Sequence, residues 1–163
     1  MNIEIVTASS NDAKRLRDLR LRALADAPYA FGADYKVESE KPIEYWQDYL
    51  KNTDWCFAVI DGVDIGLLAV DKADADRNSD CWMASWWLEE AYRGQGIPKL
   101  MLEWFDKLCI AKGWNKQGLG VWPENERAIA AYMKLGFVKG DKPLQSRSRP
   151  EKMYLPMYRN LPL

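Results

Sequence analysis

Apolar residues recur along this chain with two different periods, and each change of period marks an expected element. Short apolar runs and alternation predict strands, because successive strand side chains point to opposite faces. Apolar residues three or four positions apart predict helices that bury one stripe. The expected strands are 3–7, 55–60, 65–70, 82–88, 117–122, 137–138 and 152–157; the expected helices are the segment before Pro28, 42–50, 97–112 and 125–135.

The order of these elements predicts an α/β (α+β) fold. Meander strands come first and strand-helix-strand units follow, which favours a mixed, largely antiparallel central sheet with helices on both faces. Asp61-Gly62 predicts a type I′ hairpin turn between the second and third strands. Residues 28–40 and the acidic stretch 71–80 are expected to be irregular. We find no repeat or linker and expect a single domain, 1–163.

The boundary of the first helix is expected from its polar neighbours. Ser9, Ser10 or Asn11 can cap its first turn, because their side chains accept hydrogen bonds from free backbone N–H groups. Pro28 cannot continue a helix and is expected to stop it.

Composition narrows the chemistry. The 163 residues carry a formal charge of −1 and include no histidine. This excludes the Ser-His-Asp triad, the Cys-His dyad and histidine-containing zinc sites. Eight Trp and eight Tyr predict an aromatic core or an aromatic-lined pocket.

Charge and targeting signals favour a cytoplasmic protein. With a net charge near zero, the sequence shows no excess of basic residues of the kind that binds nucleic acid or an anionic membrane. We see no signal peptide and no transmembrane run. The cysteines, Cys56, Cys81 and Cys109, are expected to be buried, reduced thiols.

One acidic pattern resembles a calcium loop. Asp74, Asp76, Asn78 and Asp80 alternate, but serine stands where such a loop requires glycine and glutamate. We therefore expect no metal.

The most informative segment joins a strand to the best helix. Its sequence is Arg93-Gly94-Gln95-Gly96-Ile97-Pro98-Lys99. Two glycines let the backbone approach a ligand, and a helix N-terminus favours an anion. The segment is in chemical terms a pyrophosphate cradle, although glycine also suits a plain tight turn.

A second informative segment follows some thirty residues later in the chain. Asn125 is a natural N-cap, followed by Ala128, Tyr132 and Gly136-Phe137. Taken by itself, Tyr132 would be a core aromatic with a bonded hydroxyl.

Together, R-G-Q-G-I and N-x-x-A-x-x-x-Y-x-x-x-G-F resemble the GNAT superfamily of acetyl-CoA-dependent N-acetyltransferases. Residues 19–32 also look like the first helix and loop of bacterial members. Pro98 departs from the family pattern, which has a small residue there, and removes one amide donor. Proline is nevertheless well placed in a first helical turn.

The resemblance implies acetyl-CoA as the acetyl donor and assigns roles by position. Residues Arg93 to Lys99 would wrap the pyrophosphate, and the backbone of Trp86, Trp87 and Leu88 would pair with the pantetheine arm. The Leu88 amide would polarise the thioester carbonyl. Asn125 and Ala128 would hold the pantetheine or the helix start, and Tyr132 would sit near the sulfur.

Acyl transfer to an amine also needs a neutral amine and a protonated leaving thiolate. Without histidine, the base is expected to be a carboxylate or a water relay. Glu89 and Glu90 follow the strand that should carry the thioester, so one of them, with Glu89 as the candidate, could face the acceptor site; the alternative is that both are solvent-exposed loop charges. Tyr132, a phenol with a pKa of about 10, suits reprotonation of a thiolate.

The acceptor pocket is expected to draw on aromatic residues of the first loop and the hairpins. The candidates are Phe31, Tyr35, Tyr45, Trp46 and Trp82, each of which could equally be core. Five carboxylates in 34–48 could form an acidic rim for a cationic amine, or a solvated helix face.

Three functions stay open. The first is acetylation of a small-molecule amine, such as an amino acid, a polyamine or an antibiotic-like amine. The second is acetylation of a protein N-terminus or lysine, and the third is a non-catalytic acyl-CoA-binding module. The expected partner is a small-molecule acceptor, with a homodimer as an open option.

Overall fold

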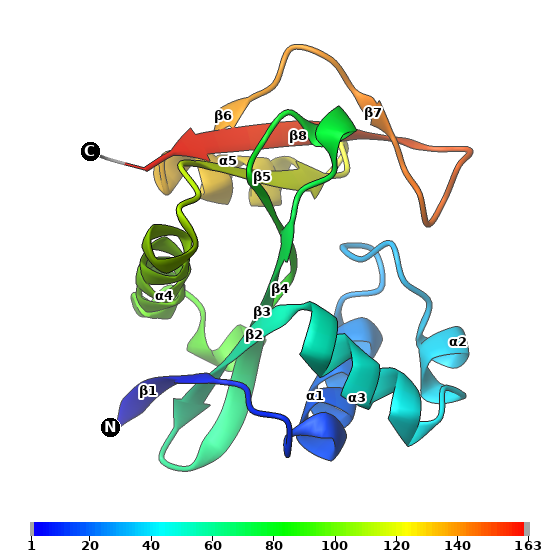
Figure 1. Cartoon of the computed structure of the whole chain (residues 1–163), viewed down its shortest axis with the longest axis vertical. Helices are drawn as coiled ribbons and strands as arrows, with labels where there is room; N and C mark the ends of the chain where they lie inside the picture. The colour runs from blue at the N-terminus through cyan, green and yellow to red at the C-terminus, as the bar shows by residue number, and fades with distance from the viewer. Residues whose placement is uncertain (1, 162–163) are drawn as a thin grey trace.

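The computed structural model describes residues 2–161 (Figure 1); Met1, Pro162 and Leu163, the ends of the predicted domain, lie outside that range. The elements are β1 Ile3–Thr7, α1 Ala13–Asp26, α2 Tyr35–Ser39, α3 Ile43–Asn52, β2 Asp54–Ile60, β3 Val63–Lys72, the 3-10 turn Ala75–Arg77, β4 Cys81–Leu88, the 3-10 turn Glu90–Tyr92, α4 Ile97–Lys112, β5 Lys116–Val121, α5 Glu126–Lys134, β6 Val138–Lys139, β7 Leu144–Gln145 and β8 Met153–Asn160.

The sheet is mixed and largely antiparallel, as the sequence predicted. Its order is β1-β2-β3-β4-β5-β8-β6, with β7 also pairing with β8. The pairs β1–β2, β2–β3 and β3–β4 form an antiparallel meander. The pair β4–β5 is parallel, since α4 carries the chain back between the two strands. The long strand β8 then pairs with β5 in the antiparallel direction.

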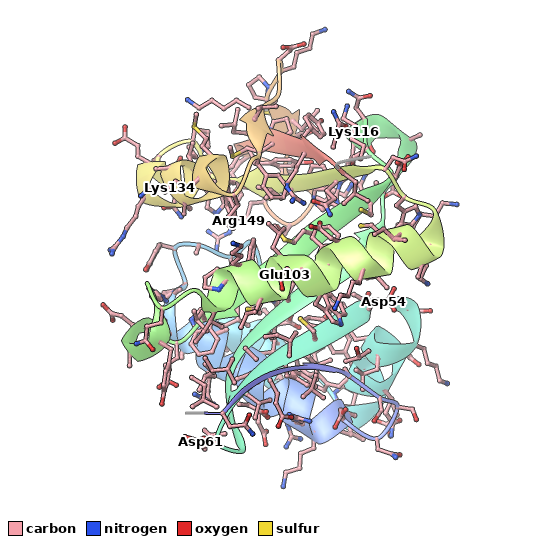
Figure 2. All side chains as sticks on the ribbon, turned by 90° about the vertical axis from the view of Figure 1, so that its left-hand side faces the viewer. Asp54, Asp61, Glu103, Lys116, Lys134 and Arg149 are labelled. Carbon is pink, nitrogen blue, oxygen red and sulfur yellow. The ribbon has the colours of Figure 1, made fainter. Side chains whose placement is uncertain are left out.

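Helices cover both faces of the sheet, and strand alternation creates a core on each side. In β2, Cys56 and Ala58 join the core beneath α4, whereas Trp55 and Phe57 join the core beneath α1 and α3. Figure 1 shows α4 on one side of the meander and α1 with α3 on the other. In Figure 2, which looks onto α4, Glu103 lies on the outward face of that helix.

The predicted hairpin turn and thiols are confirmed. Asp61 and Gly62 both have positive φ, 49° and 81°, as a type I′ turn requires. All three cysteines are free and buried.

Three local expectations were wrong. The cap position of α1 is Asp12 and not an earlier residue; its carboxylate accepts from the Ser9 amide and does not cap the helix. Residues 35–39, expected to be irregular, form α2, because the Asp34 side chain accepts from the Val37 amide and caps a helical turn. The strand β7 arises in an expected loop through pairing with β8.

The strands β4 and β5 separate after a short shared stretch. They pair over Cys81–Met83 and Gln117–Leu119. Beyond that point β4 carries a bulge: Ala84 faces Ala69 and Trp87 faces Leu67, so β4 has one extra residue. Ser85 lies in the bulge with φ 57°, a left-handed conformation. A bulge bends its strand, and Figure 1 shows β4 running away from β5.

Candidate functional site

A cavity of about 330 Å³ occupies the opening between β4 and β5. One wall is the end of β4, including Ser85, Trp86, Trp87 and Leu88. The opposite walls come from β5 and α5, and the loop after α1 closes a third side. The lining from those parts is Leu119, Gly120, Val121, Asn125, Arg127, Ala128, Ala131, Tyr132, Leu135, Ala27, Tyr29, Ala30 and Phe31.

The glycine loop stands at one end of this cavity. Gly94 and Gly96 have φ of 77° and 80°, which L side chains rarely adopt. A Cβ added at either glycine would meet no atom within 4 Å, so the loop faces open space. Gly96 is the N-cap of the 16-residue helix α4, and Pro98 lies in its first turn. Backbone amides and the helix dipole thus converge on a space that suits an anion.

Arg93 lines the cavity, and its guanidinium is bonded to β4 and α1. Its Nε donates to the Leu88 carbonyl at 2.8 Å, and a terminal nitrogen lies 3.3 Å from Asp26. The Trp87 indole donates to the same Asp26 carboxylate at 2.8 Å. Arg93 therefore fastens the end of β4 to α1.

The free edge of β4 faces the cavity. The Glu89 amide donates to the Ile65 carbonyl of β3 at 2.8 Å. Because residues of an antiparallel pair alternate between facing the partner strand and facing away, the Leu88 N–H points away from β3, into the opening. The same alternation directs the Leu88 carbonyl to Arg93.

Tyr132 lies on the α5 side of the cavity, between two aromatic rings. Its ring centroid is 5.9 Å from that of Trp86 and 6.1 Å from that of Phe137. Burial of the phenol raises the pKa of Tyr132 to about 12, since the charged form is poorly solvated there. The hydroxyl is therefore protonated at neutral pH.

Asn125 joins the start of α5 to the cavity. Its side-chain oxygen accepts from the Ala128 amide at 3.2 Å, which is the predicted capping bond. The amide NH₂ group of the same side chain has no hydrogen-bond acceptor among residues 2–161 and could donate to a ligand.

The structure brings together most, but not all, of the sequence-predicted site residues. Phe31 lines the cavity, whereas Tyr35 is exposed on α2 and Trp82 packs on Tyr154 at 5.9 Å. Tyr45 and Trp46 of α3 belong to the core shared with α1 and are not among the described lining residues. The Glu89 carboxylate pairs with Arg22 at 3.2 Å. Glu89 is also absent from the described lining of the cavity. In the glycine loop, the Ile97 side chain is core, Gln95 bonds the Ala91 carbonyl, and Lys99 is exposed.

Several lining residues carried no signal in the sequence. Tyr29 belongs to a loop expected only to be irregular and aromatic, and the sequence assigned no role to Arg127. Ser85 belongs to an apolar run in which no residue indicates a bulge.

The calcium-like stretch has other contacts. Arg147 pairs with Asp74 and Asp76, while Asp80 accepts from the Asn115 and Lys116 amides. Within residues 2–161, no three acidic or cysteine side chains are gathered as a metal site would need. No helix in the described part of the chain is long and apolar enough to cross a bilayer.

Comparison with known families agrees with this geometry. The acetyltransferase (GNAT) family matches residues 19–137. The chain belongs to the GNAT family. This confirms the family and the acetyltransferase class that the two motifs predicted.

Solved GNAT structures share the fold over nearly the whole chain. A GNAT acetyltransferase of Streptococcus pneumoniae superimposes with a TM-score of 0.75 at 19% identity, covering 98% of this chain and 100% of that one. The ribosomal-protein-alanine N-acetyltransferase of Brucella melitensis gives 0.73 at 18% identity, covering 97% and 99%. The aminoglycoside acetyltransferase AAC(6′)-Ib in complex with coenzyme A gives 0.70 at 14%, covering 98% and 95%.

No curated protein sequence matches this GNAT chain. The acceptors named for two neighbours differ, one a protein alanine and one an aminoglycoside. The shared fold therefore leaves the acceptor of this GNAT protein to be argued from its own residues.

Proposed function

We propose that this GNAT protein transfers the acetyl group of acetyl-CoA to the amine of a small molecule. One observation carries the proposal: the free Leu88 edge of β4 and the protonated Tyr132 line one cavity that leads from the glycine loop.

The residues present fit acetyl-CoA. A Cβ at Gly94 or Gly96 would meet no atom within 4 Å, so a phosphate could approach there, and the amides of the α4 N-terminus supply donors. The unpaired edge of β4 offers backbone groups to the pantetheine amides, as an added strand would. In this proposal Asn125 adds its free NH₂ group beside the same arm.

Acetyl-CoA supplies an acetyl group already activated as a thioester. The Leu88 N–H donates to the acetyl oxygen and stabilises the negative charge that gathers there, an effect of roughly 3 kcal/mol for such donors. The acceptor nitrogen bonds to the acetyl carbon as the carbon–sulfur bond breaks. Tyr132 gives its hydroxyl proton to the departing sulfur, and the nitrogen loses its own proton to water.

Water is the proton acceptor that this cavity favours. Among the described residues that line it, none is Asp or Glu. Glu89, the carboxylate that the sequence pointed to, is engaged with Arg22. The neutral amine thus arises through solvent.

The loops around the acceptor side favour a small molecule over a protein. Arg149, in the loop between β7 and β8, donates from Nε to the Gly32 carbonyl at 3.4 Å. A Cβ on Gly32 would collide with Ser148 of the same loop. This contact joins the loop after α1 to the loop between β7 and β8, and in this proposal it restricts access for an extended peptide. The three reduced cysteines fit a cytoplasmic location, and a homodimer stays a prediction.

The test measures acetyl-CoA binding by calorimetry and thiol release with amino acids, polyamines, aminoglycosides and peptides. We expect binding and thiol release with small amines. Release with peptides alone would favour a protein acetyltransferase, and tight binding without release from any amine would favour a binding module.

A further inference from the structure

A second cavity, of about 280 Å³, adjoins the first on the acceptor side. The two share the walls formed by Tyr29, Phe31 and Asn125, so they are adjacent parts of one opening. The second cavity adds Trp122 and Glu124 from the end of β5, and Arg149 and Lys152 from the loop between β7 and β8. Figure 2 shows Arg149 between α5 and the loop that follows α1.

The walls of this second cavity are positively charged. Lys152 lies 3.2 Å from Glu124 and stacks over the Trp122 ring at 4.3 Å, so these two opposite charges compensate each other. Arg149 has no such partner: within residues 2–161, no carboxylate lies within ion-pair distance of its guanidinium. Arg127, at the neighbouring wall of the first cavity, also forms no ion pair within the described chain. The net charge offered to an acceptor is positive.

The backbone next to Arg149 is anchored, and its half-buried guanidinium has donors to spare. The loop is fastened at the buried Ser146, whose hydroxyl accepts from the Arg149 amide at 3.0 Å. The Arg149 Nε donates to the Gly32 carbonyl. The two terminal nitrogens, which carry four N–H groups, find no acceptor among the described residues. A guanidinium with two free terminal nitrogens matches the two oxygens of a carboxylate or a phosphate.

The carboxylates that the sequence placed in an acidic rim, those of residues 34–48, lie elsewhere. Glu38 is buried and lies 3.6 Å from Arg20. None of the five acidic residues in 34–48 lines either cavity. The acidic rim that the sequence suggested is therefore not part of the described site.

We propose that the acceptor of this GNAT protein carries an anionic group beside its amine, a carboxylate or a phosphate, and that Arg149 binds that group. The inference rests on the proposed acetyl transfer and specifies its substrate class. The anion would occupy the second cavity. The amine would extend into the first cavity past Tyr29, Phe31 and Asn125, which line both.

The experiment compares matched acceptors by thiol release. Leucine is measured against leucinamide, and 2-aminoethyl phosphate against 2-aminoethanol, with spermidine as a cationic acceptor. We expect an anionic member to exceed its neutral analogue at least about 10-fold in kcat/KM, as loss of a charged hydrogen bond implies. Leucinamide has the lower amine pKa and more neutral amine, so a preference for leucine would oppose intrinsic reactivity. The pair that shows the preference identifies carboxylate or phosphate.

Two variants assign the effect to Arg149. We expect Arg149→Met to raise KM for the anionic acceptor with little change in kcat, because a group that binds the unreacting part acts on the ground state and transition state equally. Arg149→Lys should restore part of the loss. Arg147→Met is the matched control: this arginine belongs to the same loop, pairs with Asp74 and Asp76, and lines neither cavity. It should leave KM unchanged.

The outcomes separate this inference from the proposed function. Equal rates for anionic and neutral amines, or a preference for spermidine, would overturn the anionic acceptor and leave acetyl transfer standing. Absence of acetyl-CoA binding would overturn both. If turnover is too slow to measure, calorimetry of leucine and leucinamide with the coenzyme A complex decides, since equal or absent binding of both contradicts the proposal.

Discussion

Arg20 shows how a single buried side chain shapes the opening of the sheet. It is 5% exposed, lies 3.6 Å from the buried Glu38, and donates to the Ser85 hydroxyl within the β4 bulge. Ser85 occupies a left-handed conformation that costs a serine about 1 kcal/mol or more. The hydrogen bond from α1 therefore helps to keep β4 bent away from β5.

Replacing Arg20 should be costly for this reason. We expect Arg20→Met to lower the free energy of unfolding by about 3 kcal/mol, because Glu38 would be left buried without its partner. The double variant Arg20→Met with Glu38→Leu should recover much of that loss. Urea denaturation of the variants provides the measurement, and equal stability of Arg20→Met and the native chain would contradict the account.

Tyr132 is the residue whose hydroxyl the chemistry uses. We expect Tyr132→Phe to reduce kcat roughly 10²-fold, the usual contribution of a positioned acid, because the leaving thiolate loses its proton donor. The affinity for acetyl-CoA should hardly change, since the ring and its contacts with Trp86 and Phe137 remain. Steady-state thiol release and calorimetry measure the two quantities, and an undiminished kcat would remove Tyr132 from the mechanism.

At the scale of elements, the start of α4 is the part that recognises charge. Gly96→Asp should weaken coenzyme A binding at least about 10-fold, because a carboxylate would stand where the helix N-terminus attracts phosphate. Gly96→Asn is the control, since asparagine tolerates positive φ and brings no charge. Calorimetry compares the two, and equal affinity of the aspartate variant and the native chain would contradict a phosphate cradle there.

The same element shows what could be predicted from sequence and what could not. The helix α4 was predictable, because its buried stripe and the glycines at Gly96 and Gly113 are local features. The glycine loop and Tyr132 carried a family pattern. Two features were not predictable, because each depends on a contact with a distant segment. The bulge at Ser85 depends on α1, and the place of Arg149 in the second cavity depends on Gly32.

On the scale of the whole molecule, aromatic residues serve both the cores and the site. Trp46 and Trp55 are fully buried beneath α1 and α3, whereas Trp86 and Trp87 line the cavity. The abundance of Trp and Tyr thus reflects both of the uses that the sequence left open. Burial of the tyrosine phenols, unlike that of the indoles, also gives the fold a pH dependence.

Phenols buried in this fold should make it sensitive to alkali. Desolvation by burial is the main cause that raises the pKa of Tyr45, Tyr49, Tyr154 and Tyr158, and it raises that of Tyr132 to about 12. In the unfolded chain a tyrosine ionises near pH 10. Between about pH 10 and pH 12 the unfolded state therefore binds fewer protons than the folded state, so the free energy of unfolding falls as pH rises.

We expect a steep loss of stability above about pH 10, to which Tyr132 contributes on the order of 2 kcal/mol by pH 12. Urea denaturation at a series of pH values measures the slope, and the ultraviolet absorbance of tyrosinate reports ionisation in the native state. Tyr132→Phe should make the slope shallower, because one buried phenol no longer resists ionisation. A slope unchanged in that variant would mean that the Tyr132 hydroxyl is solvated. The assignment of Tyr132 as the residue that protonates the departing sulfur would then be less well supported.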